Sequence, residues 1–338
     1  MSVDLYVIGN ALVDLEYSVD DQFLQQHQLL KGTMQLAEQT AQQQLLAHLN
    51  QNHHAQEQAS GGSAANSTVA FTAMGGSAFY ACRVGNDDFG RFYLNGLSQA
   101  NVQTSSSSMS EGETGTCVVL VTPDSERTMQ TYLGITAELS AAQIDFEPLK
   151  TAKYLYIEGY LATSPTARLA VKHAREIAKD SNIATAITLS DPAMVQYARE
   201  GLDDLIADGV DILFCNEHEA RMYTGTEQLD DTVAALLNLG NIVIITRSEQ
   251  GAIIATRSGK RLTIEAVPCN AIDTLGAGDA FAGAFLYGLN KGYTLENCGK
   301  LAAATASKVV SQYGPRLSVE QYQAILQAGS FASDLAAI

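Results

Sequence analysis

The run VDILFCNEHEA, residues 210–220, begins with mostly apolar residues and ends with mostly polar ones. Three similar runs flank it, and each is short, apolar and bounded by turn residues: KYLYIEG (153–159), IATAITLSDP (183–192) and NIVIITRS (241–248). Two segments between these runs, 165–179 and 194–206, are predicted to be helices. Short apolar strands separated by helices are typical of a parallel sheet that is buried on both faces. The sequence therefore predicts an α/β fold with a doubly wound, mostly parallel sheet.

The same alternation extends toward the N-terminus, where a different pattern interrupts it. Strands are expected over 5–9 and 78–84, and a helix over 87–97. A Ser-rich segment, 104–112, then precedes two strand-like runs, TCVVLVT and RTMQTYL, which are joined by the polar turn PDSE. We expect one domain over residues 1–338, with a small β lid formed by about residues 11–36 and 114–134.

Composition limits the classes of partner. The chain has 338 residues and is 46% hydrophobic, which is enough to bury a large core. Its 37 acidic and 20 basic residues give a formal net charge of -17, which argues against a nucleic acid or an anionic membrane as the partner. The five cysteines are scattered without a CxxC spacing, and no apolar run is long enough to span a bilayer. These features predict a soluble, cytoplasmic protein.

DTLGAGDAFAGAFLYGL, residues 273–289, places a carboxylate directly behind three small residues. Gly276, Ala277 and Gly278 leave backbone N–H groups uncovered where a helix begins, so we expect an anion to bind there. Asp279 would repel a phosphate, but it suits the hydroxyl that attacks the phosphorus, because that hydroxyl needs a proton acceptor. The stretch therefore predicts a phosphotransferase site.

The residues alone leave other interpretations of this stretch open. Asp is a common helix N-cap, and a run of small residues often means only that a helix packs closely against a sheet. A Walker-type P-loop is excluded because GxxxxGK[ST] is absent from the sequence. A Rossmann dehydrogenase is disfavoured because GAGDAFAG matches GxGxxG poorly and comes late in the chain.

Two long motifs carry a resemblance to a known family. The stretch 273–289 resembles the C-terminal signature of the ribokinase (PfkB) family of carbohydrate kinases, and SGGSAANSTVAFTAMGG (60–76) resembles its N-terminal sugar-binding signature. Within that family the chain is most similar to adenosine kinases, through GNALVDLE, TMQLAEQ, TGTC and the EGY loop. The resemblance implies a ribokinase-like fold with a β lid. It also implies ATP- and Mg-dependent phosphorylation of a primary hydroxyl on a ribose-containing acceptor, with adenosine preferred.

The resemblance also implies roles for individual residues. Asp279 is expected to be the catalytic base, Gly276, Ala277 and Gly278 the anion hole, and Arg127 the arginine that closes onto the transferred phosphate. The residues implied to bind the acceptor are Asn10, Leu12, Asp14, Leu36, Gly61, Gly62, Asn66, Cys117 and Tyr160. Those implied near the nucleotide are Asn216, Thr246, Gly251, Gly276 and Gly278. Asn216 and Glu219 are implied to order Mg through water, and Asp273 and Leu275 to bind a monovalent cation such as K.

Several of these residues have simpler interpretations. Asp14 is also consistent with a surface strand residue, Asn66 with a helix cap, and Arg127 with a solvated salt bridge to Asp124 or Glu126 on its own hairpin. Ser248 stands where the family usually has glycine, so the backbone near the nucleotide is expected to differ there. The acceptor alternatives are a free sugar, namely ribose, fructose or a ketodeoxy sugar acid. A different class of function is a non-catalytic nucleoside-binding protein. The sequence allows a monomer or a homodimer that pairs through the lid.

Overall fold

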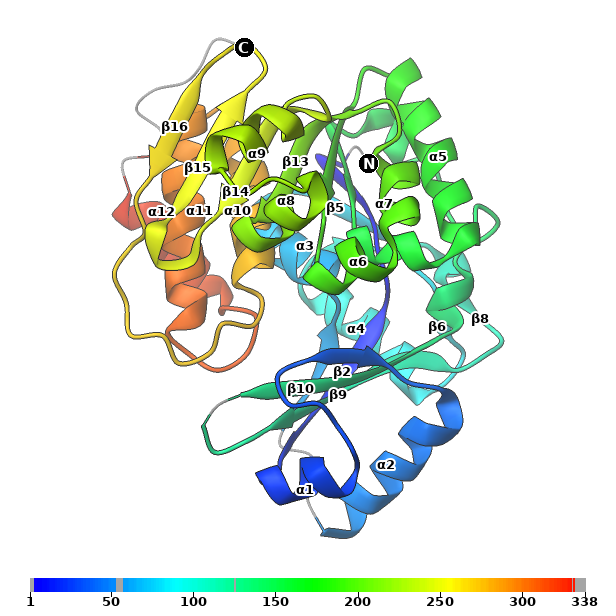
Figure 1. Cartoon of the computed structure of the whole chain (residues 1–338). Coiled ribbons are helices and arrows are strands. Elements are labelled where there is room, and N and C mark those ends of the chain that lie inside the picture. The colour runs from blue at the N-terminus through cyan, green and yellow to red at the C-terminus, as the bar shows by residue number, and fades with distance from the viewer. Residues whose placement is uncertain (1–2, 53–56, 125, 330, 332–338) are drawn as a thin grey trace.

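A nine-stranded sheet forms the centre of the computed structural model, which describes residues 3–52, 57–124, 126–329 and 331 (Figure 1). The strand order is β16-β15-β14-β13-β12-β11-β1-β5-β7, and the pairs are parallel except β14–β15 and β15–β16. The strands are β1 (Leu5–Ile8), β5 (Ala78–Ala81), β7 (Val102–Gln103), β11 (Tyr154–Ile157), β12 (Ala184–Thr188), β13 (Val210–Asn216), β14 (Gly240–Thr246), β15 (Ala252–Thr256) and β16 (Arg261–Ile264). The predicted α/β fold with a mostly parallel sheet is confirmed.

Helices cover both faces of this sheet. Successive side chains of a strand point to opposite sides, so each strand contributes residues to two cores. Leu5 and Val7 of β1 belong to one hydrophobic core, and Tyr6 and Ile8 belong to the other. The first core packs against α3 (Ser63–Ala73), α4 (Asp88–Gln99), α10 (Ala277–Asn290), α11 (Leu295–Val310) and α12 (Val319–Ala328). The second packs against α5 (Pro165–Asp180), α6 (Pro192–Tyr197), α7 (Arg199–Ile206), α8 (Glu217–Thr224) and α9 (Leu229–Leu236).

A second sheet of five strands lies below the main sheet in the view of Figure 1. Its order is β3-β10-β9-β2-β4, with β2 parallel to β9 and antiparallel to β4. Helices α1 (Asp21–Gln26) and α2 (Gln39–Asn52) lie beside it, and the Gln42 amide of α2 donates to the carbonyls of Thr116 and Gln130. The strands are β2 (Leu12–Ser18), β3 (Met34–Leu36), β4 (Glu57–Gly61), β9 (Thr114–Val121) and β10 (Arg127–Gly134).

Short elements complete the chain. Strands β6 (Val84–Gly85) and β8 (Met109–Ser110) form a two-stranded ladder. Single 3₁₀ turns are η1 (Ser106–Ser108), η2 (Ile135–Glu138), η3 (Leu149–Thr151), η4 (Gly159–Thr163) and η5 (Ser248–Gln250). Within the described residues, no helix is both long enough and apolar enough to cross a membrane.

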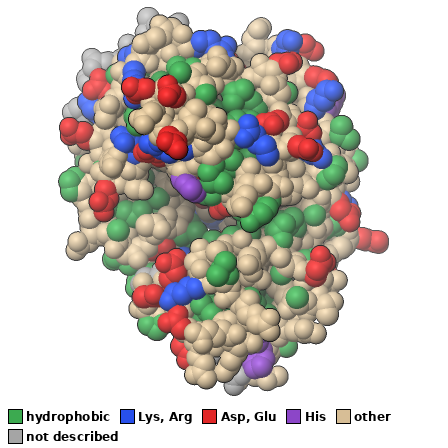
Figure 2. Space-filling view, in the orientation of Figure 1, with side chains coloured by type: hydrophobic (Ala, Val, Ile, Leu, Met, Phe, Trp, Pro, Cys, Tyr) green, Lys and Arg blue, Asp and Glu red, His purple; other side chains and the backbone are tan. Residues whose placement is uncertain are grey.

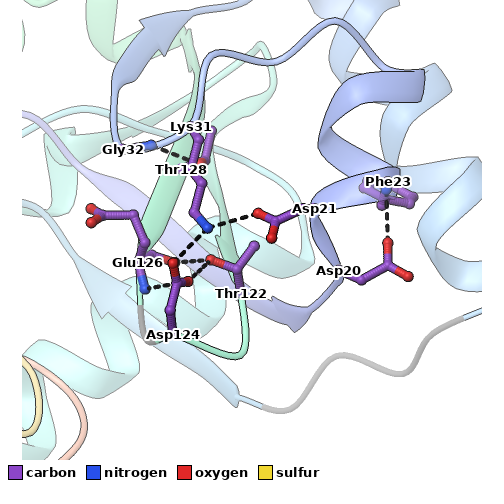
Figure 3. A network of polar contacts seen from close by, with 9 residues as sticks. All are labelled: Asp20, Asp21, Phe23, Lys31, Gly32, Thr122, Asp124, Glu126 and Thr128. Carbon is purple, nitrogen blue, oxygen red and sulfur yellow. Dashed lines mark hydrogen bonds and ion pairs between the residues drawn. The ribbon is translucent and has the colours of Figure 1, made fainter.

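A cluster of polar contacts joins the β9–β10 hairpin to the loop after α1 (Figure 3). The Lys31 ammonium lies 2.7 Å from both Asp21 and Asp124, and the Thr122 hydroxyl donates to Asp124 at 2.6 Å. Beside them, the N–H of Gly32 donates to the Thr128 hydroxyl. These ion pairs are solvent-exposed and contribute little stability, but they align the loop with β10 next to Arg127. The predicted turn PDSE includes residue 125, which lies outside the described residues.

Two details differ from the sequence-based expectation. Residues 194–206 were predicted as one helix, but the structure has α6 and α7 with a break at Ala198, whose φ and ψ are -125° and 29°. A side chain at Gly201 would lie 2.1 Å from the Ala162 carbonyl, so this glycine permits α7 to pack closely against η4. The strand expected over 78–84 is also divided, into β5 and the first residue of β6.

Candidate active site

A cavity of about 450 Å³ lies between the carboxyl ends of the main-sheet strands and the five-stranded sheet. On the face shown in Figure 2, the surface is hollowed where these two parts of the molecule meet. Most of the predicted site residues line this cavity: Asn10, Leu12, Asp14, Leu36, Gly62, Asn66, Cys117, Arg127, Tyr160, Asn216, Glu219, Thr246, Leu275, Gly276, Gly278 and Asp279. Gly61, Gly251, Asp273 and Ala277 are not among its lining residues. Segments far apart in the sequence are thus brought to one place.

Asp279 lies in the first turn of α10, with its side chain at the cavity. Its Oδ1 accepts a hydrogen bond from the Ser63 hydroxyl at 2.6 Å, and its Oδ2 accepts one from the Asn66 amide at 2.9 Å. The N-cap of α10 is Gly276, and no side chain caps this helix. The interpretation of Asp279 as an N-cap is therefore wrong, and two residues of α3 hold its carboxylate instead.

The start of α10 presents backbone donors to the same cavity. Gly276 has φ 73° and ψ 0°, a left-handed conformation that glycine adopts without strain. The N–H groups of Gly278 and Asp279 meet no acceptor within the described chain, whereas that of Ala277 donates to the Thr274 carbonyl at 3.3 Å. Free N–H groups at a helix start form a ready anion site. Ala277 thus contributes less to such a site than its two neighbours.

Two glycines of α10 have different structural surroundings. A side chain at Gly283 would come within 2.2 Å of the Ser67 carbonyl, so this glycine permits α10 to cross α3 closely. A side chain at Gly278 would meet nothing within 4 Å, so close packing does not explain that glycine. Gly278 is exposed and faces open space beside Asp279. Packing therefore accounts for Gly283 and leaves the space beside Gly278 free for a ligand.

The neighbourhood of the cavity is rich in acids. Burial raises the pKa of Asp279, although hydrogen bonds from Ser63 and Asn66 and the nearby Arg316 guanidinium oppose this effect. Burial also raises the pKa of Asp14 to about 7, that of Glu158 to about 8 and that of Glu219 to about 7. Perturbed carboxylates gathered in one cavity are typical of a functional site.

Asp14 and the glycines after β4 form one side of the cavity. Gly61 is required by Asp14, because a side chain at Gly61 would lie 2.1 Å from the Asp14 carboxylate. Gly62 has φ 98°, and a side chain there would lie 2.9 Å from the Asn10 carbonyl. Gly62 is also the N-cap of α3, so a single residue separates β4 from the helix that holds Asp279. The interpretation of Asn66 as a helix cap is wrong, because Asn66 lies inside α3 and bonds to Asp279.

Glu158 is a site residue that the sequence interpretation did not single out. It follows β11, only 1% of its surface is exposed, and it lines the cavity. Its Oε2 accepts from the backbone N–H groups of Asn10 and Ala64, and its Oε1 accepts from the Asn10 amide. The EGY motif of the resemblance contains this residue, and that motif was the available signal. Ser63 was missed in the same way, within the N-terminal signature.

Arg127 connects the five-stranded sheet to the loop before α10. Its guanidinium lies 3.0 Å from Glu16 on β2 and 2.7 Å from Asp273 in the loop before α10. The interpretation of Arg127 as a salt bridge within its own hairpin is therefore wrong, because Asp124 pairs with Lys31 instead. Asp273 is 7% exposed, and its carboxylate also accepts from the N–H groups of Leu275 and Gly314. Protein donors thus engage both Asp273 oxygens, so a monovalent cation here would rely on carbonyl oxygens.

Asn216 and Glu219 face the cavity where β13 passes into α8. They form a capping box, in which the Asn216 side chain accepts from the Glu219 N–H at 2.8 Å and the Glu219 carboxylate accepts from the Asn216 N–H at 3.0 Å. Each carboxylate oxygen can still accept from a water, so the pair fits water-mediated binding of Mg²⁺ rather than direct ligation. No cluster of three His, Cys, Asp or Glu side chains with metal-binding geometry occurs among the residues that the structure describes.

The β14–β15 turn borders the same cavity through Thr246, whose hydroxyl lies 3.5 Å from the Cys215 carbonyl. Gly251 lies behind it with φ 75°, where a side chain would meet the Ile264 carbonyl at 1.9 Å. Ser248 has φ 51°, the left-handed conformation that favours glycine. The serine therefore keeps the backbone shape that a glycine would take at this position.

Apolar side chains of the five-stranded sheet form the remaining wall of the cavity. They are Leu12, Met34, Leu36, Cys117, Met129 and Leu133. Tyr160, on η4, lines another part together with Asp191, which caps α6. The cavity thus has a polar part around Asp279 and an apolar part on the smaller sheet, which suits a ligand that has both polar and apolar portions.

Comparisons with known proteins agree with this geometry. Residues 33–321 match the pfkB family carbohydrate kinase domain. Adenosine kinase from Saccharomyces cerevisiae is 26% identical over 95% of this chain and 98% of its own length, and 5-dehydro-2-deoxygluconokinase from Clostridium beijerinckii is 28% identical over 78% and 82%.

Two solved structures are similar along almost the whole chain. Adenosine kinase from Sinorhizobium meliloti has a TM-score of 0.89 and 33% identity, covering 97% of this chain and 100% of that one. A probable sugar kinase from Rhizobium etli has a TM-score of 0.88 and 33% identity, covering 97% and 99%. The fold, the two motifs and these similarities together place the chain in the pfkB family of carbohydrate kinases, as a kinase of sugars or nucleosides.

Proposed function

We propose that this protein is an ATP- and Mg-dependent kinase that phosphorylates the primary hydroxyl of a ribose-containing acceptor, with adenosine preferred. The observation that carries the proposal is the position of Asp279, whose carboxylate is held by Ser63 and Asn66 beside the unpaired N–H groups at the start of α10. Asp279 would take the proton from the acceptor hydroxyl. The N–H groups would stabilise the negative charge on the transferred phosphoryl group.

The electrostatics of the cavity support a divalent cation with the nucleotide. Asp279 and the ionised fractions of Asp14 and Glu219 bring negative charge to the cavity, whereas Glu158, with its pKa of about 8, is mostly protonated at neutral pH. Arg127 is the one lysine or arginine among the described residues that line the cavity. A triphosphate would be repelled unless its charge were compensated. Mg²⁺ bound with the nucleotide supplies that compensation, and Asn216 and Glu219 would hold its waters.

The acceptor is argued from the two parts of the cavity. The apolar wall of the smaller sheet offers contact area for a purine, and Asp14 and Asn66 offer hydrogen-bonding groups for ribose hydroxyls. An anionic acceptor such as ketodeoxygluconate is less favourable, because it would bring a carboxylate among those of the site. A neutral free sugar is the second candidate, because the buried Glu158 and Asn10 add polar groups to the cavity.

The five-stranded sheet would act as a lid. It carries Arg127, which would leave Asp273 and contact the transferred phosphate when the acceptor and ATP are bound. Closure would exclude water and limit wasteful hydrolysis of ATP. The division into a kinase body over 1–338 and a lid near 11–36 and 114–134 is part of this proposal.

The test is an ATP-consumption assay with Mg²⁺, with and without K⁺, on adenosine, inosine, ribose, fructose and ketodeoxygluconate. We expect the highest kcat/KM with adenosine and little K⁺ dependence, because the backbone N–H groups of Leu275 and Gly314 already engage both oxygens of the Asp273 carboxylate. Faster turnover of ribose or fructose would replace adenosine by a free sugar. No turnover of any acceptor, together with nucleoside binding in calorimetry, would support a non-catalytic binding protein.

A further inference from the structure

A third residue stands behind the two that hold Asp279. The Arg316 guanidinium Nε lies 2.8 Å from Oδ1 of Asn66, whose Nδ2 donates to Asp279 at 2.9 Å. A side-chain amide has an acceptor on one side and donors on the other. A donor placed at its oxygen therefore fixes which end faces the carboxylate. If the Asn66 amide turned over, its oxygen would meet the Asp279 oxygen and repel it.

The chain holds Arg316 in place from several sides. The guanidinium donates to the Ser60 carbonyl on β4, and the Arg316 carbonyl accepts from the Gln312 amide at 3.0 Å. Two preceding residues touch the loop before α10. The Gly314 N–H donates to Asp273 at 2.8 Å, and Pro315 packs where a side chain on Gly276 would lie. Arg316 does not line the cavity, so it acts through other residues rather than on a substrate.

The charges around Asp279 make this arginine unusual. Arg316 is the cation that lowers the pKa of Asp279, and it also opposes the raised pKa of Asp14. The other titratable groups that interact with Asp279 carry no positive charge: they are the carboxyl groups of Asp14, Glu158 and Glu219 and the neutral phenols of Tyr156, Tyr160 and Tyr322. Without Arg316, burial would favour the protonated form of Asp279, which cannot accept a proton.

We propose that Arg316 is a positioning residue of this site: it holds the Asn66 amide so that its N–H faces Asp279, and thereby keeps the carboxylate oriented and ionised. The role in phosphoryl transfer rests on the proposed function. The simpler alternative is that Arg316 only attaches the segment before α12 to β4 through Ser60. In that case its loss would lower stability without affecting Asp279.

The kinetic test is a double-mutant cycle between Arg316→Met and Asn66→Ala, assayed with adenosine, ATP and Mg²⁺. Arg175→Met is the matched control, because Arg175 also donates to backbone carbonyls, those of Leu205 and Gly209, away from the cavity. We expect Arg316→Met to lower kcat by about ten- to a hundredfold with little change in the KM for ATP. The double variant should be about as slow as Asn66→Ala, whereas Arg175→Met should keep its kcat. Multiplicative losses, or an unchanged kcat in Arg316→Met, would overturn the proposal.

A second measurement does not depend on any acceptor. The Asp279 carboxyl carbon is titrated by NMR in protein with labelled aspartate, and its signal is assigned with Asp279→Asn. Arg316→Met should raise the pKa of Asp279, and Arg175→Met should leave it unchanged. Arg316→Lys, which retains a charge, should give a smaller rise and replaces the methionine variant if that one does not fold. An unmoved Asp279 pKa in the Arg316 variants would overturn the proposal even in an active enzyme. A raised pKa in a protein inactive on all acceptors would instead overturn the proposed function alone.

Discussion

The Arg127 guanidinium, on the five-stranded sheet, lies 2.7 Å from the Asp273 carboxylate in the loop that leads into α10. The two side chains are 10% and 3% exposed, so the ion pair is largely removed from water. It joins the smaller sheet to the loop before the proposed anion site. In the proposed reaction cycle Arg127 has to exchange this partner for the transferred phosphate.

Arg127→Met is expected to affect both stability and turnover. Removing one member of a buried pair leaves the other uncompensated and destabilises the fold by about 3 kcal/mol. Turnover should fall by about 10³-fold, because the charge on the phosphoryl group loses its arginine. Thermal unfolding and steady-state kinetics measure the two effects. Glu16→Gln is the control, since it breaks only the outer contact of Arg127. A variant with wild-type turnover would show that Arg127 has a structural role alone.

Asp279→Asn is expected to separate activity from stability. Loss of the base should lower kcat by about 10²- to 10⁴-fold, with much less effect on ATP binding. The free energy of unfolding should change by no more than about 1 kcal/mol, because the substitution removes a carboxylate whose burial is unfavourable. Calorimetric ATP binding and chemical denaturation are the measurements. Equal losses in ATP binding and turnover would contradict the assignment of Asp279 as the base.

Two glycine substitutions in α10 distinguish packing from ligand binding. Gly278→Ala places a methyl group in open space beside Asp279, so it should keep or slightly raise the melting temperature while lowering kcat/KM. Gly283→Ala places the methyl group against the Ser67 carbonyl and should destabilise the protein by about 1 to 3 kcal/mol. Scanning calorimetry and kinetics of both variants provide the comparison. If Gly278→Ala kept full activity, the proposed anion site at this helix start would be wrong.

Glu158 predicts a pH dependence of stability. Burial raises its pKa from 4.5 to about 8, so between these pH values the folded state binds more protons than the unfolded state. The contribution of Glu158 to stability therefore falls as pH rises from about 4.5 to about 8, by up to about 1.4 kcal/mol per pH unit. Glu158→Gln resembles the protonated form and should lack this loss. Its stability relative to the wild type should increase with pH in urea denaturation. Parallel stability curves for the two proteins would exclude a raised Glu158 pKa.

The main sheet was predictable because its strands are short apolar runs that can be recognised from the neighbouring residues alone. β13 is an apolar run that ends in Asn216, and Glu219 follows one helical turn later, so the spacing alone placed both at the carboxyl edge of the sheet. The strand β4 was missed because EQASG has no apolar alternation. Its strand conformation depends on pairing with β2, which is a tertiary contact.

The polar partnerships were not predictable for a related reason. Arg127 is 146 residues from Asp273 in the sequence, and Arg316 is 250 residues from Asn66. No spacing rule links residues so far apart, and each arginine has closer acids that suggest a local pair. The two signatures contain Asp279, the proposed base, and Asn66, whereas Arg316 and the partner of Arg127 became evident only when the chain was folded.

Gly62 alone separates the last strand of the smaller sheet from the helix that carries Ser63 and Asn66. A tilt of that sheet would therefore move the two groups that hold the Asp279 carboxylate, the proposed proton acceptor. Acceptor preference and the rate of the chemical step would then both depend on the connection through Gly62. Evolution or engineering toward a new acceptor would have to adjust acceptor preference and the rate of the chemical step together.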